Sequence, residues 1–397
     1  MLVTNTLPDH GHALDAADAE ILSVESAKEV ERFLSHRQNH RPTPLHSLAG
    51  LARQTGVAAI HVKDEGFRLG LGSFKALGGS YAVIRLVLEE AERKLGRPVD
   101  ISELHSEAVA EVARQMTVGC ATDGNHGRSV AAGAQLVGAK AAIFVHSGVS
   151  DERVAAIAKF GAQMIRVKGT YDDSVVEAER VCDENGWIVV SDTSWPGYER
   201  IPGLVMQGYT AMLNEALRKL PSPPTHVFIQ AGVGGLAASV AGYFDVIFGK
   251  DRPRLVVVEP DRAACIYESA LAGKPVKIEQ GEETIMAMLE CYEPSLVAWR
   301  VLSKTADAFM TVAEDDAANC MRKLASPCPG DPAIVAGESG AAGLAGYLRV
   351  MQHEDARATL GLDSNSRVFV INTEGATDQA RYAAIVGIDP SEVSVAA

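Results

Sequence analysis

The chain has 397 residues, of which 47% are hydrophobic and 22% charged, enough to bury the core of a globular protein of two or three domains. Acidic residues outnumber basic ones by 51 to 37, and the net charge of −14 argues against nucleic acid as a partner. The sequence contains neither a signal-peptide core nor an apolar run near the roughly 18–20 residues that span a bilayer, so we expect a cytoplasmic protein without a membrane partner. Its six cysteines form no C-x-x-C pair and have no His cluster at zinc spacing, so no metal is expected.

Strand and helix signals alternate from about residue 57 onward, which predicts α/β layers with parallel sheets. A compact βαβαβ block is expected between about residues 100 and 200, with strands at 141–146, 163–167 and 187–190. Further strands are predicted at 227–230, 255–258 and 367–372, and only helical fragments between Pro260 and Pro332. The expected organisation is one large domain, residues 1–100 and 201–397, interrupted by a small α/β domain, residues 101–200.

Lys75 is the first candidate for covalent chemistry. It follows the glycine-rich turn 70–73 and opens an apolar helical run to about Leu88. The positive end of a helix dipole disfavours a charged amine, and Schiff-base formation requires a neutral one. A solvated surface lysine is the plain alternative for Lys75 taken alone.

A second polar motif, residues 122–127 (TDGNHG), precedes a predicted helix from Arg128 to Leu136. Two glycines around a polar pair leave backbone N–H groups that can bind a carboxylate at the start of a helix. Asn125 supplies both a donor and an acceptor. An Asx turn that caps the helix explains the same residues without a ligand.

A glycine loop lies between the predicted strand 227–230 and a predicted helix, residues 236–244. Its residues are Gly232, Val233, Gly234, Gly235 and Leu236. Strand, glycine loop and helix in this order form a phosphate site, because the backbone amides point at the anion. The loop also reads G-x-G-x-x-A, and Glu259 ends the next strand where an acid could bind a ribose, so a nicotinamide dinucleotide is a rival interpretation of this motif alone. Tight packing of helix on strand is a third.

Together and in this order, the three motifs resemble those of the fold type II pyridoxal-phosphate (PLP) enzymes, which include serine and threonine dehydratases and tryptophan synthase β. Within that group the chain is most similar to diaminopropionate ammonia-lyase. The segments that carry the similarity are 63–75 (KDEGFRLGLGSFK), 122–128 (TDGNHGR), 191–198 (SDTSWPGY), 201–202, 206–209 and 372–375. The resemblance covers most of residues 40–380. It implies a large open twisted α/β domain interrupted by a smaller α/β domain, and a homodimer.

The resemblance also implies roles for individual residues. Lys75 would hold pyridoxal 5′-phosphate covalently, Asn125 would contact the cofactor, the glycine loop would bind its phosphate, and Thr373 would meet the pyridine nitrogen. The substrate contacts implied are Ser73, Thr122, Asp123, Gly124, His126 and Asp192. Glu338 is expected near the ring, and His126 is expected to orient its loop rather than to exchange protons.

Two carboxylates distinguish this chain from the dehydratases, which usually carry a small hydroxyl residue directly before Gly-Asn-His-Gly. Asp123 occupies that place here, and Asp192 follows the strand 187–190. Two acids suit a small amino-acid substrate with a second ammonium group, although an acid in a turn is the structural alternative for Asp192. The implied reaction is α,β-elimination of 2,3-diaminopropionate to pyruvate and two ammonia. Lys75 would remove the Cα proton of the L-isomer, and Asp123, with Asp192, that of the D-isomer.

Three alternatives stay open. A PLP-dependent dehydratase or racemase acting on serine, threonine or hydroxyaspartate would share every cofactor residue and differ only at the two carboxylates. A nicotinamide-dependent oxidoreductase would use only the glycine loop and Glu259. A non-catalytic protein could keep the fold for binding or regulation.

Two pairs of residues have less definite interpretations. Cys265 and Cys291 flank the segment with the weakest pattern and could form a disulfide, although two reduced thiols are expected in the cytoplasm. Trp195 and Tyr198 either line the substrate cleft or pack in the core.

Overall fold

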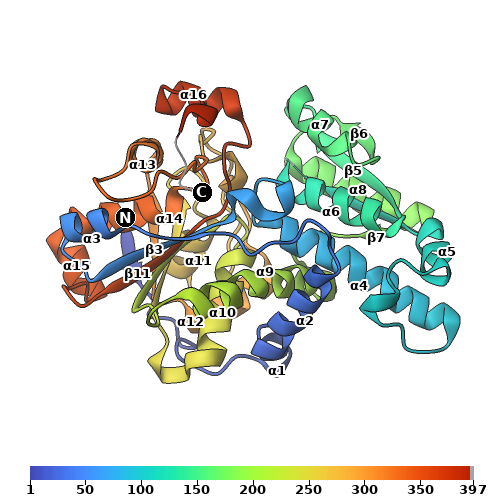
Figure 1. Ribbon diagram of the computed structural model, residues 1–397, viewed down its shortest axis with the longest axis horizontal. Helices are drawn as coiled ribbons and strands as arrows, with labels where there is room; N and C mark the ends of the chain where they lie inside the picture. The colour runs from blue at the N-terminus through green and yellow to red at the C-terminus, as the bar shows by residue number, and fades with distance from the viewer. Residues whose placement is uncertain (123, 394–397) are drawn as a thin grey trace. The chain divides into compact units, whose positions relative to one another are not determined.

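The computed structural model describes residues 1–122 and 124–393 of the protein, which divides into two compact units (Figure 1). The larger unit comprises Met1–Val24, Arg41–Phe74 and Met212–Ala397, and the smaller comprises Glu25–His40 and Lys75–Ala211. Helix α9 (Arg200–Lys219) contributes residues to both units, and α2 (Val24–Ser35) belongs almost wholly to the smaller one. No helix in the described part of the chain has the length and apolar character needed to cross a membrane.

The larger unit is built on a seven-stranded sheet in the order β1-β10-β9-β8-β11-β3-β2. Its five central strands run parallel, and the two edge strands are antiparallel to their neighbours. The strands are β1 (Leu2–Thr4), β2 (Leu45–Ser47), β3 (Ala59–Asp64), β8 (His226–Gln230), β9 (Arg254–Pro260), β10 (Ala308–Val312) and β11 (Arg367–Asn372). Every residue of β8 and β10 is buried, as expected for parallel strands covered on both faces.

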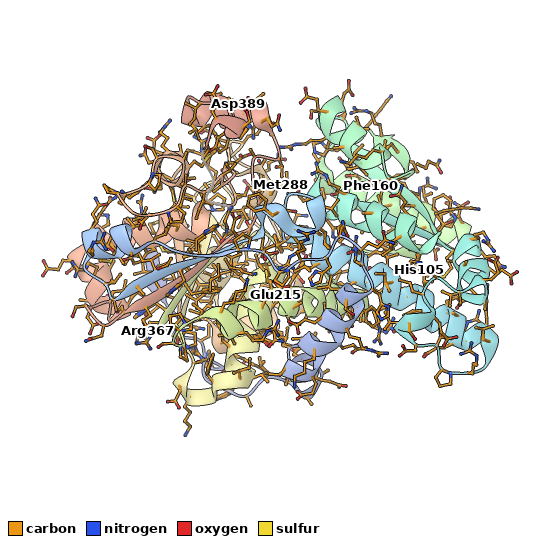
Figure 2. All side chains as sticks on the ribbon, viewed as in Figure 1. His105, Phe160, Glu215, Met288, Arg367 and Asp389 are labelled. Atoms are coloured by element: carbon orange, nitrogen blue, oxygen red, sulfur yellow. The ribbon has the colours of Figure 1, made fainter. Side chains whose placement is uncertain are left out.

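Helices and short 3₁₀ turns cover this sheet. They are α1 (Ala16–Ile21), α3 (Ala49–Thr55), η1 (Glu65–Gly70), α10 (Gly235–Phe248), η3 (Gly249–Asp251), α11 (Cys265–Ala272), η4 (Ala287–Leu289), α12 (Leu296–Thr305), α13 (Glu314–Ala325), α14 (Ala342–Met351), α15 (Glu354–Leu360), α16 (Gln379–Val386) and η5 (Pro390–Glu392). Helix α14 packs directly on the central strands because glycines face them: a Cβ on Gly343 would lie 2.8 Å from the Phe228 oxygen, and one on Gly346 would lie 2.7 Å from Val258. Side chains fill the space between these layers (Figure 2).

The smaller unit contains a four-stranded parallel sheet in the order β6-β5-β4-β7. Its strands are β4 (Thr117–Ala121), β5 (Lys140–His146), β6 (Gln163–Val167) and β7 (Ile188–Val189). Its helices are α4 (Lys75–Leu95), η2 (Ile101–Glu103), α5 (Glu107–Gln115), α6 (Asn125–Val137), α7 (Asp151–Ala158) and α8 (Tyr171–Asn185). A small core of Ala142, Phe144, Ala178 and Cys182 joins α8 to the sheet.

Small residues bring α4 close to α6 and α9. A Cβ on Gly79 would lie 2.8 Å from the Ser129 oxygen, and a Cβ on Gly208 would lie 2.7 Å from the Cα of Gly78. Side chains larger than hydrogen at these positions would push the helices apart, because close-packed interiors have no room for them. The start of α4, where Lys75 lies, is thereby held firmly within its unit.

The predicted α/β class and the βαβαβ block are confirmed, with the strand predicted at 187–190 shortened to Ile188–Val189. One expectation was wrong: the segment between Pro260 and Pro332 holds a complete central strand, Ala308–Val312, as well as helices. The sequence predicts a large domain of residues 1–100 and 201–397 and a small domain of residues 101–200. This division stays a prediction, because a compact unit of the structure is not by that fact a domain that folds independently.

Candidate active site

Lys75 is the first residue of α4, and its Nζ forms an ion pair with the carboxylate of Asp192, two residues beyond Val190 at the end of the β7 region. The side chains of Lys75 and Asp192 are 20% and 12% exposed, so the pair is largely shielded yet reachable. The helix terminus taken alone favours a neutral amine at Lys75. The adjacent carboxylate acts in the opposite direction, because an opposite charge favours the ammonium form.

His126 lies on the other side of the same carboxylate. Its Nε2 is 2.8 Å from the Val190 carbonyl oxygen, which can only accept, so Nε2 carries the hydrogen. Burial lowers the pKa of His126, although the charge of Asp192 raises it, so the ring is neutral and Nδ1 has a lone pair. That Nδ1 is 3.9 Å from Asp192 Oδ2 and has no hydrogen-bond partner among the described residues.

Asp192 is ionised in this setting. Burial on its own would raise the pKa of its carboxyl, but the ammonium charge of Lys75 and the hydrogen bond from Lys75 hold that pKa well below its ordinary value, and protonation of His126 would lower it further. The smaller unit therefore presents a carboxylate between an amine and an imidazole. Tyr209 is buried close enough for the charges of Lys75 and Asp192 to act on its hydroxyl, whose pKa is raised chiefly by burial.

The polar loop before α6 is organised by Thr122. Its Oγ1 accepts hydrogen bonds from the N–H groups of Gly124 and Gly127, both at 3.0 Å. Gly127 is sterically required, because a Cβ there would lie 2.2 Å from Thr122 Cγ2. Asn125 and His126 begin the helix itself, three residues earlier than predicted, and both are nearly buried. Thr122 thus shapes the loop, and its predicted contact with substrate stays a prediction.

Of three other predicted site residues, the structure describes Ser73 and Glu338 but not Asp123. Asp123 lies outside the described residues, so its predicted role stays a prediction. Ser73 is buried and forms an antiparallel bridge with Glu374. Glu338 is nearly buried, and its carboxylate lies 3.8 Å from a guanidinium nitrogen of Arg381.

In the larger unit, the glycine loop connects β8 to α10 as the sequence predicts. Gly234 has φ +99°, a conformation that favours glycine, and forms the N-cap of α10 without any side chain to satisfy the first amides of the helix. A Cβ on Gly232 would lie 2.9 Å from Cys291 Sγ, and one on Gly234 would lie 2.8 Å from Ile266. The loop therefore offers uncapped backbone N–H groups at a 14-residue helix, which is suited to an anion such as phosphate.

Thr373 follows β11 and is held by Gln230, the last residue of β8. Gln230 Nε2 lies 3.0 Å from Thr373 Oγ1 and within 3.1 Å of three carbonyl oxygens, those of Ser339, Gly340 and Ile371. Carbonyl oxygens only accept, so this atom is the amide nitrogen and Thr373 Oγ1 accepts from it. The single hydroxyl hydrogen of Thr373 is left to donate, which suits a contact with an unprotonated pyridine nitrogen.

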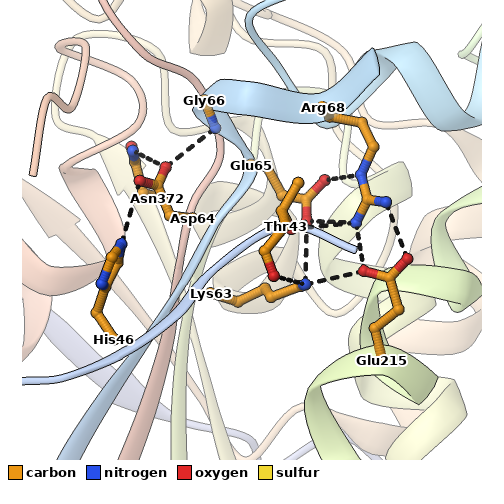
Figure 3. Close-up of polar contacts among 9 residues, drawn as sticks. All are labelled: Thr43, His46, Lys63, Asp64, Glu65, Gly66, Arg68, Glu215 and Asn372. Carbon is orange, nitrogen blue, oxygen red and sulfur yellow. Dashed lines mark hydrogen bonds and ion pairs between the residues drawn. The ribbon is translucent and has the colours of Figure 1, made fainter. Parts of the chain in front are cut away.

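A buried ion cluster precedes the turn that leads to Lys75 (Figure 3). Lys63 Nζ lies 2.9 Å from Glu215 Oε2, Arg68 Nη2 lies 2.7 Å from the same oxygen, and Arg68 Nε lies 2.8 Å from Glu65 Oε2. All four side chains are at most 1% exposed. Thr43 completes the set, since its carbonyl oxygen accepts from Lys63 and its hydroxyl donates to Glu65.

The turn after this cluster is fixed at both ends. Leu69 adopts φ +52°, which is unusual for a residue with a side chain. The Gly375 N–H donates to the Gly72 oxygen at 3.0 Å, and the Phe74 N–H donates to the Thr373 oxygen at 2.9 Å. The backbone that delivers Lys75 is therefore joined to the segment that carries Thr373.

Glu259 does not serve the role that a nicotinamide dinucleotide would need. It is fully buried, and its two oxygens accept from the N–H groups of Ile266 and Tyr267 at 2.9 and 2.6 Å, so it caps α11. Burial raises the pKa of Glu259 to about 8, although these two backbone hydrogen bonds lower it. The acid that the rival interpretation assigned to a ribose is thus already occupied.

Two further predictions concern cysteines and metals. All six cysteines are thiols, including Cys265 and Cys291, so no disulfide joins these two in the structure. Within residues 1–122 and 124–393, no group of three or more His, Cys, Asp or Glu residues is arranged to hold a metal ion.

Sequence reasoning missed two residues that organise the site. Gln230 was counted only as part of a strand, although an amide at the end of an otherwise apolar strand was a usable signal. Tyr198 had two open interpretations, and the structure shows its hydroxyl bonded to the backbone on both sides of Val190, beside Asp192. Nothing in the local sequence indicated that contact.

Comparisons with known proteins agree on one family. Residues 36–374 match the family model of the pyridoxal-phosphate dependent enzymes. Diaminopropionate ammonia-lyase of Escherichia coli (strain K12) is 40% identical over 374 residues, covering 92% of each chain. Its crystal structure with an aminoacrylate-PLP azomethine reaction intermediate matches with a TM-score of 0.87, 38% identity and coverage of 97% of this chain and 96% of that one. The structure of the E. coli enzyme with D-serine has the same TM-score at 36% identity, covering 100% of this chain and 98% of that one.

Proposed function

We propose that this chain, which belongs to the diaminopropionate ammonia-lyase family of fold type II pyridoxal-phosphate-dependent enzymes, eliminates ammonia from 2,3-diaminopropionate. The substrate and one water would yield pyruvate and two ammonia. The observation that carries the choice of substrate is the ionised Asp192 carboxylate beside Lys75. A dehydratase acting on a hydroxyl substrate has no need of this charge, whereas a second ammonium group on the substrate pairs with it.

The residues present fit pyridoxal 5′-phosphate. Lys75 supplies an amine at the start of a firmly packed helix, the glycine loop supplies uncapped amides for a phosphate, and Thr373 supplies a hydroxyl donor. When bound, this cofactor supplies an electron-poor ring that accepts the electron pair released at the α-carbon of the substrate. Thr373 would place a hydroxyl rather than a carboxylate at the pyridine nitrogen, and that nitrogen would then stay unprotonated.

The roles of the chain's own groups follow from their positions. Lys75, which would hold the cofactor, would be the base for the Cα proton of the L-isomer. Asp192 binds the β-ammonium group and keeps it oriented for departure as ammonia. Neutral His126 donates to the Val190 oxygen and so holds the backbone next to Asp192, and its role in orienting its own loop stays a prediction. Asp123 is the proposed base for the D-isomer, on the resemblance alone.

The test is a coupled assay of pyruvate and ammonia with both diaminopropionate isomers, L-serine and L-threonine as separate substrates. We expect two ammonia per pyruvate from diaminopropionate and a much smaller kcat/KM for the hydroxyl substrates. A higher kcat/KM for serine or threonine, with one ammonia per keto acid, would identify a dehydratase instead.

The cellular setting belongs to the same proposal. We infer a homodimer and a cytoplasmic location, both by resemblance to the family. Light scattering of the purified protein should give twice the mass of one chain, and a monomer at assay concentration would contradict the dimer.

A further inference from the structure

The turn that carries Asp192 has little support from its own sheet. Strand β7 pairs with β4 only at Ile188 and Val189, and the last backbone bond runs from the Val190 N–H to the Gly119 oxygen at 2.8 Å. Just beyond this point, the described contacts of the Ser191 and Thr193 N–H groups are with side-chain oxygens, those of Tyr198 and Ser191. Asp192 lies in neither a strand nor a helix, because β7 ends at Val189 and α9 begins only at Arg200.

Tyr198 holds this turn from one side. Its hydroxyl donates to the Val189 oxygen at 2.7 Å and accepts from the Ser191 N–H at 3.0 Å. One oxygen thereby bridges the residues on either side of Val190, whose own carbonyl accepts from His126. The backbone immediately before Asp192 is therefore clamped by two side chains, Tyr198 and His126.

The Tyr198 side chain is itself well fixed. Its ring stacks on Trp195 with centroids 4.2 Å apart and planes inclined by 13°, and its N–H donates to the Trp195 oxygen at 2.9 Å. Burial raises the pKa of the Tyr198 hydroxyl, so the group keeps its proton at any pH at which enzymes of this kind work. A hydroxyl that stays protonated is a permanent donor to Val189 and takes no part in proton exchange.

We propose that Tyr198 is a positioning residue, whose hydroxyl fixes the turn after β7 and thereby places the Asp192 carboxylate next to Lys75 and His126. This inference rests on the proposed function in one respect, the reaction in which Asp192 takes part. The placement of Asp192 by Tyr198 does not depend on which reaction that is. From the sequence, Tyr198 could either line the substrate cleft or pack in the core. The proposal gives it a third role, in which its hydroxyl supports a site residue through polar contacts.

Asp192 needs such support from its backbone. Its contact with His126 Nδ1 is 3.9 Å long, beyond hydrogen-bond range, and cannot orient the carboxylate alone. Its contact with Lys75 is altered whenever that amine is joined to a cofactor. The position of the carboxylate during a reaction cycle therefore depends on the turn.

A double-mutant cycle on the purified enzyme with its cofactor tests this dependence. Tyr198→Phe removes one oxygen atom and keeps the ring stack. We expect it to lower kcat on diaminopropionate roughly 10- to 100-fold, because loss of one hydrogen bond or a shift of about 1 Å has effects of this size, and to raise KM, because Asp192 binds the β-ammonium group. Tyr347→Phe is the matched control, since its hydroxyl bonds to Thr55 at 2.8 Å within the larger unit. It should leave kcat unchanged.

The decisive comparison uses Asp192→Asn. If Tyr198 acts through Asp192, then adding Y198F to D192N lowers kcat no further than D192N alone. Multiplication of the two single losses in the double variant would overturn the proposal, because it would mean that Tyr198 acts independently of Asp192. Trp195→Leu, which removes the stack but keeps the hydroxyl, should give a smaller loss with the same dependence on Asp192, and it replaces Y198F in the cycle if that variant does not fold.

A crystal structure of Y198F gives an answer that does not depend on activity. We expect the Asp192 carboxylate to move away from its wild-type position 3.9 Å from His126 Nδ1. An unmoved carboxylate would overturn the proposal whatever the kinetics show. A wild-type enzyme that makes no pyruvate from diaminopropionate would contradict the proposed function alone, and the crystal structure would still decide the role of Tyr198.

Discussion

Single buried polar side chains in this protein join segments that are far apart in the sequence, because they hydrogen-bond to groups of those segments. Gln230 illustrates this at the scale of one residue: it is buried, and its amide nitrogen contacts a hydroxyl and a carbonyl that lie 143 and 141 positions further along the chain. Such an amide joins β8, β11 and the loop before α14 at one point. Replacing it removes several partners at once.

We predict that Gln230→Leu lowers the free energy of unfolding by about 1–3 kcal/mol, the usual cost of leaving buried polar groups without partners. It should also weaken cofactor binding, because Thr373 loses the bond that directs its hydroxyl. Urea denaturation and an absorbance titration with pyridoxal 5′-phosphate measure the two effects. Gln352→Leu, at an exposed glutamine, is the control and should change neither.

Asp123 supports a second prediction at this scale, drawn from the resemblance. Asp123→Asn should reduce kcat/KM for the D-isomer of diaminopropionate far more than for the L-isomer, because the two Cα protons lie on opposite faces of the bound substrate and Lys75 serves only one. Pyruvate release from the separate isomers measures this. Equal losses for both isomers would refute the assignment of one base to each face.

Among the elements, the loop between β8 and α10 has the clearest steric requirement. Gly234 combines a positive φ with a neighbour 2.8 Å from any added Cβ. We predict that Gly234→Ala weakens binding of pyridoxal 5′-phosphate about tenfold or more, since a residue with a side chain costs roughly 1–3 kcal/mol in that conformation. Gly281→Ala, at a glycine with open space around it, should bind as the wild type does.

Most elements could be predicted from the sequence because their signals are local. The strand at 367–372 is found with its bounds unchanged, and the strand at 163–167 likewise, since apolar runs of this length are bounded by turn residues. The strand Ala308–Val312 was missed because neither glycine nor proline separates it from the helices before and after it. The site shows the same division: motifs revealed Lys75 and the glycine loop, whereas the contacts of Tyr198 and Gln230 depend on tertiary structure.

At the scale of the whole molecule, the buried cluster of Lys63, Glu65, Arg68 and Glu215 ties β3 and η1 to the part of α9 that belongs to the larger unit (Figure 3). Burial alone would raise the pKa of Glu215, but its bonds to Arg68 and Lys63 lower it to about 2. A carboxyl whose folded pKa lies below its unfolded value stabilises the fold fully above the unfolded value of 4.5. That contribution is lost as pH falls from about 4.5 to about 2.

We predict that Glu215→Gln lowers the free energy of unfolding at neutral pH by roughly 3–5 kcal/mol, because it leaves a buried cation without its partner. The difference between wild type and variant should shrink as pH falls through that acid range. Denaturant unfolding at a series of pH values measures it. Glu177→Gln, which breaks an exposed pair with Arg180, is the control and should change stability little at any pH. A difference for Glu215→Gln that does not vary with pH would contradict the charged state assigned here.

The most direct test of the whole account is reduction of the purified protein with borohydride after reconstitution with pyridoxal 5′-phosphate, followed by mass mapping of the labelled peptide. We predict that the yellow colour is discharged and that the pyridoxyl group is found on Lys75, the first residue of α4. A label on another lysine, or a colourless protein that takes up no label, would contradict the claim that Lys75 carries the cofactor and with it the proposed elimination.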